Sequence, residues 1–461
     1  MDRQAAVWTR ARSGLLAALG LALLGLLRPI GADARPEAPA NPNAGSLEIR
    51  SVAGPLGRGT ATSDTVGMLI RSAAGHAGRG DIALADADLR RALRADPTDD
   101  RPARALDVLY RQSDAAIPID QAAVDAALEQ LGPGFRVSRT RHFVVLSDCD
   151  PRWTRSRERL LERAYRAVRR FADRVGVRSH PPEHRMLCVL IDDHDRYEAF
   201  ARAHDGVTAH WVAGYYASAS NRVVFYHDRS SPSVRAAYAR LERFEAAIAE
   251  GKSRQLEAER AGDADAARAI GEQVRRLAAH ADARRLDLDA ESERISTAKT
   301  VHEAAHLAAF NCGLQSRART YPFWITEGLA TGFETGDPDR PFGPDRAEPH
   351  READIGEAVA AGRVLPLRDF VRVVDASSYD RDSASALYAQ AYGVFRYAAR
   401  TEPQSLGAFL ELVAAERPGR IDADRLGELF RMAFGDETAF ERSWLAFERD
   451  RIRRSAPAGG G

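Results

Sequence analysis

Residues 300–310 read TVHEAAHLAAF, and this stretch decides how the rest of the chain is interpreted. Its composition is helical, and Gly313 is a suitable residue to end the helix. Side chains four positions apart share one face of a helix, so His302 and His306 can present their imidazoles to one ion. Glu303 follows His302 directly, and its carboxylate can reach a water molecule beside that ion. The pattern predicts a metal-binding helix that carries an adjacent carboxylate.

A second element reads YPFWITEGLAT at residues 321–331, and it predicts an aromatic turn that leads into another helix. Glu327 stands there among bulky apolar side chains, so we expect it to be buried, and a buried carboxylate needs a partner. A catalytic zinc site has three protein ligands and one open position. We therefore expect His302, His306 and Glu327 to hold one Zn²⁺ ion. Two imidazoles and one carboxylate suit zinc better than calcium or magnesium, which prefer oxygen ligands alone.

Together, HEAAH and WITEGLATGFE resemble the gluzincins, the zinc peptidases with a glutamate as third ligand. The W-x-x-E-G-x-A element is closer to the aminopeptidase-like branch than to thermolysin. More narrowly, the chain is similar to a group of secreted bacterial peptidase-like proteins of unknown function, which AGYY at 213–216 and YAQAY at 388–392 also fit. The resemblance covers about residues 135–447, apart from an inserted segment. It implies an α+β fold: a mainly helical zincin-like catalytic domain with a small mixed sheet.

The resemblance also implies roles for single residues. The two histidines and Glu327 match the zinc ligands, and Glu303 matches the general base that takes a proton from a zinc-activated water. Tyr388 matches the donor to the tetrahedral oxyanion. Tyr392, one turn later, is the alternative donor, and both tyrosines could instead be core aromatics. Glu334, further along the same predicted helix face as Glu327, is either an acceptor for a ligand histidine or a surface charge.

Two departures from related enzymes narrow these expectations. Residues 213–216 lack the acidic cluster with which the exopeptidase branch binds a free amine, so aminopeptidase specificity is not expected. Cys312 stands where the other large zincin class has its third histidine, and we do not expect it to bind zinc.

The predicted function is that of a secreted zinc-dependent hydrolase, a metallopeptidase acting on a peptide or protein substrate. One alternative is a non-catalytic secreted zinc-binding scaffold with a peptidase-like fold. Intact Glu303 argues against it, because a non-catalytic zinc site does not need that carboxylate. Another alternative is a zinc hydrolase of non-peptide amides, such as a cell-wall linkage.

Composition and charge predict a globular protein that does not bind nucleic acid. The chain has 461 residues, of which 44% are hydrophobic and 29% are charged, so globular folding is expected. Its 66 Lys and Arg residues balance its 66 Asp and Glu residues. A chain without a net basic field is not expected to bind nucleic acid. The oligomeric state is not predicted.

The amino terminus predicts export. Residues 1–34 read as a signal peptide, with a basic start, a Gly/Ala/Leu run over 14–27 that is short for a membrane span, and small residues at 32–34. We expect a secreted, periplasmic or cell-envelope protein without an integral membrane span after cleavage. The alternative is an uncleaved N-terminal anchor.

Patterning divides the remaining chain into segments. Residues 35–62 read as a linker, 63–130 as a helical module similar to one tetratricopeptide unit, 131–455 as the gluzincin-like domain, and 456–461 as a flexible tail. Within the domain, residues 232–295 predict an inserted helical hairpin that turns near Gly262. Cys149, Cys188 and Cys312 read as three buried thiols, or as one disulfide and one free thiol.

Overall fold

The computed structural model describes residues 61–96, 99–112, 117–208, 212–376 and 379–455. The predicted signal peptide, the predicted tail and all but the last two residues of the predicted linker lie outside these ranges. Within them, no helix combines the length and apolarity that a membrane span requires.

A five-stranded mixed sheet forms one part of the fold. In spatial order its strands are β1 (Arg136–Arg139), β2 (Phe143–Ser147), β3 (Met186–Ile191), β5 (Arg222–Tyr226) and β4 (Gly214–Ala217). The three central strands are parallel, and the edge strands β1 and β4 are antiparallel to their neighbours. The sheet is small beside the helices, so the mainly helical α+β class is confirmed.

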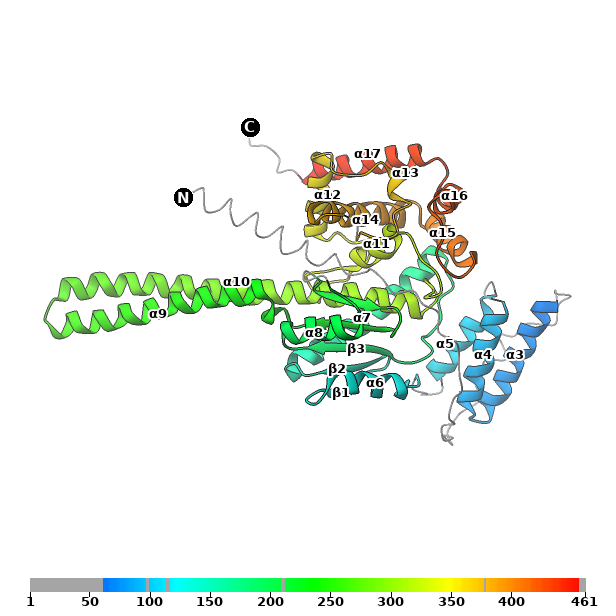
Figure 1. Cartoon of the computed structure of the whole chain (residues 1–461), viewed down its shortest axis with the longest axis horizontal. Helices are drawn as coiled ribbons and strands as arrows, with labels where there is room; N and C mark the ends of the chain where they lie inside the picture. The colour runs from blue at the N-terminus through cyan, green and yellow to red at the C-terminus, as the bar shows by residue number, and fades with distance from the viewer. Residues whose placement is uncertain (1–60, 97–98, 113–116, 209–211, 377–378, 456–461) are drawn as a thin grey trace.

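Helices cover both faces of this sheet (Figure 1). Alternate residues of a strand point to opposite faces, and both sets are apolar here. Phe143 and Val145 belong to the core that α7 (Pro151–Val175) and α10 (Ala264–Asn311) share. The opposite face packs against α6 (Gln121–Leu131) and α8 (His194–His204). All but the last residue of α6 falls inside the predicted 63–130 module, yet the buried side chains of this helix pack against the sheet.

A long helical hairpin projects from the body (Figure 1). Its arms are α9 (Pro232–Arg260) and the first part of α10, and Gly262 makes the turn with φ 76°. The predicted hairpin is therefore present, with its own small core, but it does not end near residue 295. Helix α10 runs for 48 residues without a break, so the second arm and the HEAAH segment are one helix.

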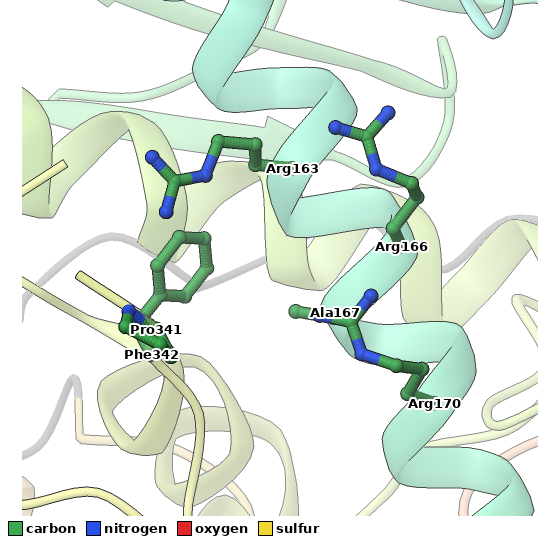
Figure 2. A pocket seen from close by; sticks show the side chains of 6 residues that line it. All are labelled: Arg163, Arg166, Ala167, Arg170, Pro341 and Phe342. Atoms are coloured by element: carbon green, nitrogen blue, oxygen red, sulfur yellow. The ribbon is translucent and has the colours of Figure 1, made fainter. Parts of the chain in front are cut away.

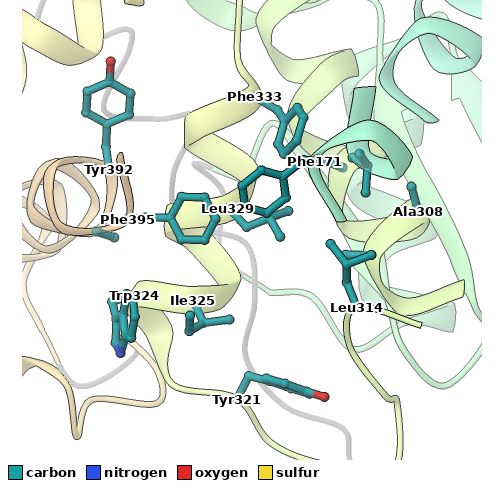
Figure 3. Packing of buried hydrophobic residues seen from close by; sticks show 14 of the residues in the cluster. Phe171, Ala308, Leu314, Tyr321, Trp324, Ile325, Leu329, Phe333, Tyr392 and Phe395 are labelled. Atoms are coloured by element: carbon teal, nitrogen blue, oxygen red, sulfur yellow. The ribbon is translucent and has the colours of Figure 1, made fainter. Parts of the chain in front are cut away.

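Further helices complete the body. They are α11 (Phe323–Phe333), α12 (Pro349–Ala360), α13 (Leu367–Phe370), α14 (Arg381–Thr401), α15 (Pro403–Ala415), α16 (Ala423–Phe434) and α17 (Glu437–Ser455). Figure 3 shows α11 in the middle of the apolar core, with Leu329 and Phe333 beside Phe171 of α7 and Phe395 of α14.

The N-terminal helices α3 (Ala61–Gly78), α4 (Ile82–Ala95) and α5 (Arg101–Gln112) enclose a separate core. Buried Arg90 joins them to the body, because its Nη2 donates to the carbonyl of Pro182 at 3.0 Å. All three cysteines are buried free thiols. The prediction of three buried thiols is therefore confirmed, and the alternative of one disulfide is not.

Candidate metal centre

Three predicted ligand residues meet at one point inside the molecule. The Nε2 atoms of His302 and His306 lie 3.2 Å apart, and the Glu327 carboxylate oxygens lie 3.4 Å from His302 Nε2 and 3.7 Å from His306 Nε2. Ligand atoms about 2.0–2.1 Å from a tetrahedral ion are separated from one another by about 3.3 Å. All three side chains are buried. The donor set and its spacing therefore fit one metal ion.

The two helices that carry these residues are held by close packing. Helix α10 ends at Asn311, and Gly313 then turns the chain with φ 96°. In α11, a Cβ atom on Gly328 would lie 2.6 Å from Phe395 Cβ and 2.7 Å from the carbonyl of Ala391. Only glycine lets α11 approach α14 this closely, and this approach fixes the position of the neighbouring Glu327.

Glu334 contacts a ligand histidine. Helix α11 ends at Phe333, so Glu334 is the residue after the helix and does not continue its face as predicted. It is nevertheless buried, and its Oε1 lies 2.7 Å from His302 Nδ1. The surface-charge alternative is wrong. A carboxylate at Nδ1 keeps the proton on that nitrogen and leaves the Nε2 lone pair for an ion.

Arg351 is a site residue that the sequence did not reveal. It lies in α12, is buried, and forms a two-pronged pair with Glu334: Nε to Oε2 and Nη2 to Oε1, each 2.7 Å. Burial alone would raise the pKa of Glu334, but Arg351 and His302 together lower that pKa to about 2. Glu334 is thus held as a carboxylate. No local pattern distinguishes Arg351 from the many other arginines of this chain.

The side chain of Glu303 extends from α10 towards the sheet. It is buried against edge strand β4, where a Cβ on Gly214 would lie 3.3 Å from Glu303 Oε1. One helical turn earlier, buried Lys299 pairs with Asp228 at 2.8 Å and donates to the carbonyl of Tyr226 at 2.7 Å. Burial raises the pKa of Glu303 to about 8.

The charges around His302 favour a cation. Burial alone would lower the pKa of its imidazole, but hydrogen bonds to Glu327 and Glu334 and the charges of the nearby carboxylates raise it to about 10. A proton and a metal ion compete for the same Nε2 lone pair. The raised pKa therefore indicates a negative potential that would also attract a divalent ion.

The two candidate tyrosines are both buried in α14. The ring of Tyr388 packs edge-on against Phe323 at 4.9 Å, and its hydroxyl interacts electrostatically with Arg351. The hydroxyl of Tyr392 accepts a hydrogen bond from the backbone amide of Glu348 at 3.4 Å. Both therefore contribute to the core, and the oxyanion role stays a prediction.

Comparison with known proteins adds one finding. Residues 294–422 match a family model described as a protein of unknown function, DUF1570. The matched segment contains both histidines, Glu303, Glu327, Glu334, Arg351 and both tyrosines. No curated protein matches the chain.

Proposed function

We propose that this chain is a zinc-dependent hydrolase of the gluzincin type, a metallopeptidase that cleaves peptide bonds. The observation that carries the proposal is the convergence of His302 Nε2, His306 Nε2 and the Glu327 carboxylate within a buried site, with Glu303 beside them. The family match names no activity, so the proposal rests on these residues.

The surroundings of the ligands support zinc as the metal. Two imidazole nitrogens and one carboxylate leave an open position in a four-coordinate shell, as catalytic zinc sites do. Glu334 fixes the orientation of His302, and Arg351 fixes Glu334. Such outer contacts are typical of metal-ligating histidines.

Glu303 and a tyrosine are the proposed reacting groups of the protein. A bound zinc ion supplies Lewis-acid chemistry and a water of lowered pKa. Glu303 would accept a proton from the attacking water and deliver it to the leaving amine. Tyr388, or Tyr392, would donate a hydrogen bond to the developing oxyanion.

The experiment compares wild-type protein with Glu303→Gln. Zinc content is measured by mass spectrometry, and cleavage is followed over a peptide library. We expect about one zinc per chain in both proteins, since Glu303 is not a ligand. Cleavage should fall by about 10²–10⁴-fold in the variant, the usual contribution of a general base. His306→Ala is the matched control that should lose the metal.

The outcomes separate the alternatives. Equal turnover by both proteins would remove Glu303 from the mechanism. Bound zinc without turnover on any peptide, followed by turnover on non-peptide amides, would favour the cell-wall hydrolase. Bound zinc without turnover on either substrate class would favour the secreted scaffold.

A further inference from the structure

Helix α7 presents a row of arginines to solvent. Its other side packs into the core through residues such as Leu161 and Val168. The outward-facing residues are Arg152, Arg155, Arg159, Arg163, Arg166, Arg170 and Arg174. Because the whole chain has no net charge, this row is a local concentration of positive charge.

Three of these arginines border a hollow between α7 and the loop that follows α11. Arg163, Arg166 and Arg170 line one side of it, and Pro341 and Phe342 line the other (Figure 2). The hollow has a volume of about 130 Å³. The Arg163 guanidinium lies over the Phe342 ring, with Cζ 5.4 Å from the ring centroid, and donates to the carbonyl of Arg340 at 2.9 Å. These contacts fix one guanidinium at the rim.

Two of the three positive charges at the hollow have no paired carboxylate in the described part of the chain. Among the residues that the structure describes, none places a carboxylate oxygen within 4.0 Å of the Arg163 or Arg170 guanidinium. Arg166 has Glu162 at 3.7 Å, but Glu162 makes closer bonds to His142 at 2.7 Å and Thr140 at 2.7 Å.

Asp345, on the loop side, pairs instead with Arg174 at 3.4 Å. The hollow therefore concentrates like charges, and a multivalent anion would relieve their repulsion.

We propose that this hollow binds a phosphate group. Guanidinium groups form paired hydrogen bonds with phosphate oxygens, and the lining of the hollow offers three guanidinium groups to one anion. Pro341 and Phe342 offer an apolar wall for the group that carries the phosphate. The ligand is thus either free phosphate or an organic phosphate ester, and the site is distinct from the metal centre.

The test is calorimetric titration of the purified chain at constant ionic strength, with inorganic phosphate and phenyl phosphate as probes. Saturable binding with a Kd of about 1 mM or lower supports the site. Equal affinities identify free phosphate as sufficient, whereas tighter binding of phenyl phosphate identifies an ester that uses the apolar wall. The absence of saturable binding by both probes overturns the proposal.

Variants locate the binding. R163Q/R166Q/R170Q should weaken it by about tenfold or more, whereas R152Q/R155Q, which removes charge from the same helix outside the hollow, should leave it nearly unchanged. Phosphate bound at the metal centre would persist in the triple variant, and that result overturns the proposal, as do equal losses in both variants. R170Q alone changes an exposed side chain and provides the same comparison if the triple variant does not fold.

Discussion

His302 and Glu334 are 32 residues apart in the sequence, yet His302 Nδ1 and Glu334 Oε1 lie 2.7 Å apart in the buried centre. This contact joins the helix that carries two candidate ligands to the segment after the helix that carries the third. Through Arg351 it continues into α12. The orientation of one imidazole therefore depends on three helices that are separate in the sequence.

Glu334→Gln tests this relationship. The substitution removes the charge that orients His302 and takes from the buried Arg351 its closest carboxylate partner. Zinc affinity, measured by competition with a chromogenic chelator, should fall by about 10–100-fold. Glu348→Gln is the matched control, because Glu348 lies nearby and its carboxylate accepts hydrogen bonds from backbone amides, that of Gly336 at 3.3 Å. Equal zinc affinities in the two variants would show that Glu334 does not orient the ligand.

Gly328→Ala should destabilise the protein by about 1–3 kcal/mol, the usual cost of overpacking a core. The added Cβ would meet Phe395 and the backbone of α14, neither of which is a flexible chain end. Gly75→Ala in α3 is the control, since its nearest neighbour would be the end of Arg79 at 3.6 Å. Urea unfolding measures both changes. A Gly328→Ala variant as stable as wild type would refute the close approach.

The outer part of the hairpin should be dispensable for metal binding. Arg285 Nη2 and Glu245 Oε1 lie 2.7 Å apart across the two arms, so a short turn can join these positions in place of residues 246–284. We expect unchanged zinc content, because the hairpin core is separate from the core around the metal centre. Loss of zinc from the folded, shortened protein would count against this expectation.

The base of the hairpin, where Asp228 pairs with Lys299, should be important for the stability of the fold. Asp228→Asn would remove the buried ion-pair partner of Lys299, one turn from Glu303. Removing one partner of a buried ion pair costs about 3–5 kcal/mol. Denaturant unfolding should therefore show a large loss of stability, and a loss below about 1 kcal/mol would mean that this pair contributes little.

His227 should make stability depend on pH. Its ring stacks on Trp153 at 4.4 Å, and burial lowers the pKa of the imidazole to about 4, below its usual 6.5. Between these two pKa values the imidazole is protonated in the unfolded chain but neutral in the folded chain. The contribution of His227 to the free energy of unfolding is therefore complete above about pH 6.5 and is lost as the pH falls towards 4.

The measurement is the free energy of unfolding between pH 7 and pH 5 for wild type and His227→Gln. The free energy of unfolding should change less steeply with pH in the variant, by up to about 1.4 kcal/mol per pH unit. Identical slopes would contradict the assignment.

The sequence by itself determined the parts that follow from local periodicity. Helical spacing placed His302 and His306 on one face, Gly313 ended their helix, and the apolar neighbours of Glu327 predicted its burial. The turn of the long hairpin near Gly262 follows from the same kind of short-range pattern. These features depend on backbone geometry within a few residues, which a sequence states directly.

Tertiary structure alone decided the contacts between residues that are far apart in the sequence. The contact of Glu334 with His302 arises because α11 ends one residue before it, and its pairing with Arg351 arises because α12 returns to the same place. The packing of α6 on the sheet likewise depends on which apolar faces meet. Such contacts are chosen by the burial of apolar surface and by the need of each buried charge for a partner. Many residues far apart in the sequence satisfy those needs together, and no local pattern records the choice.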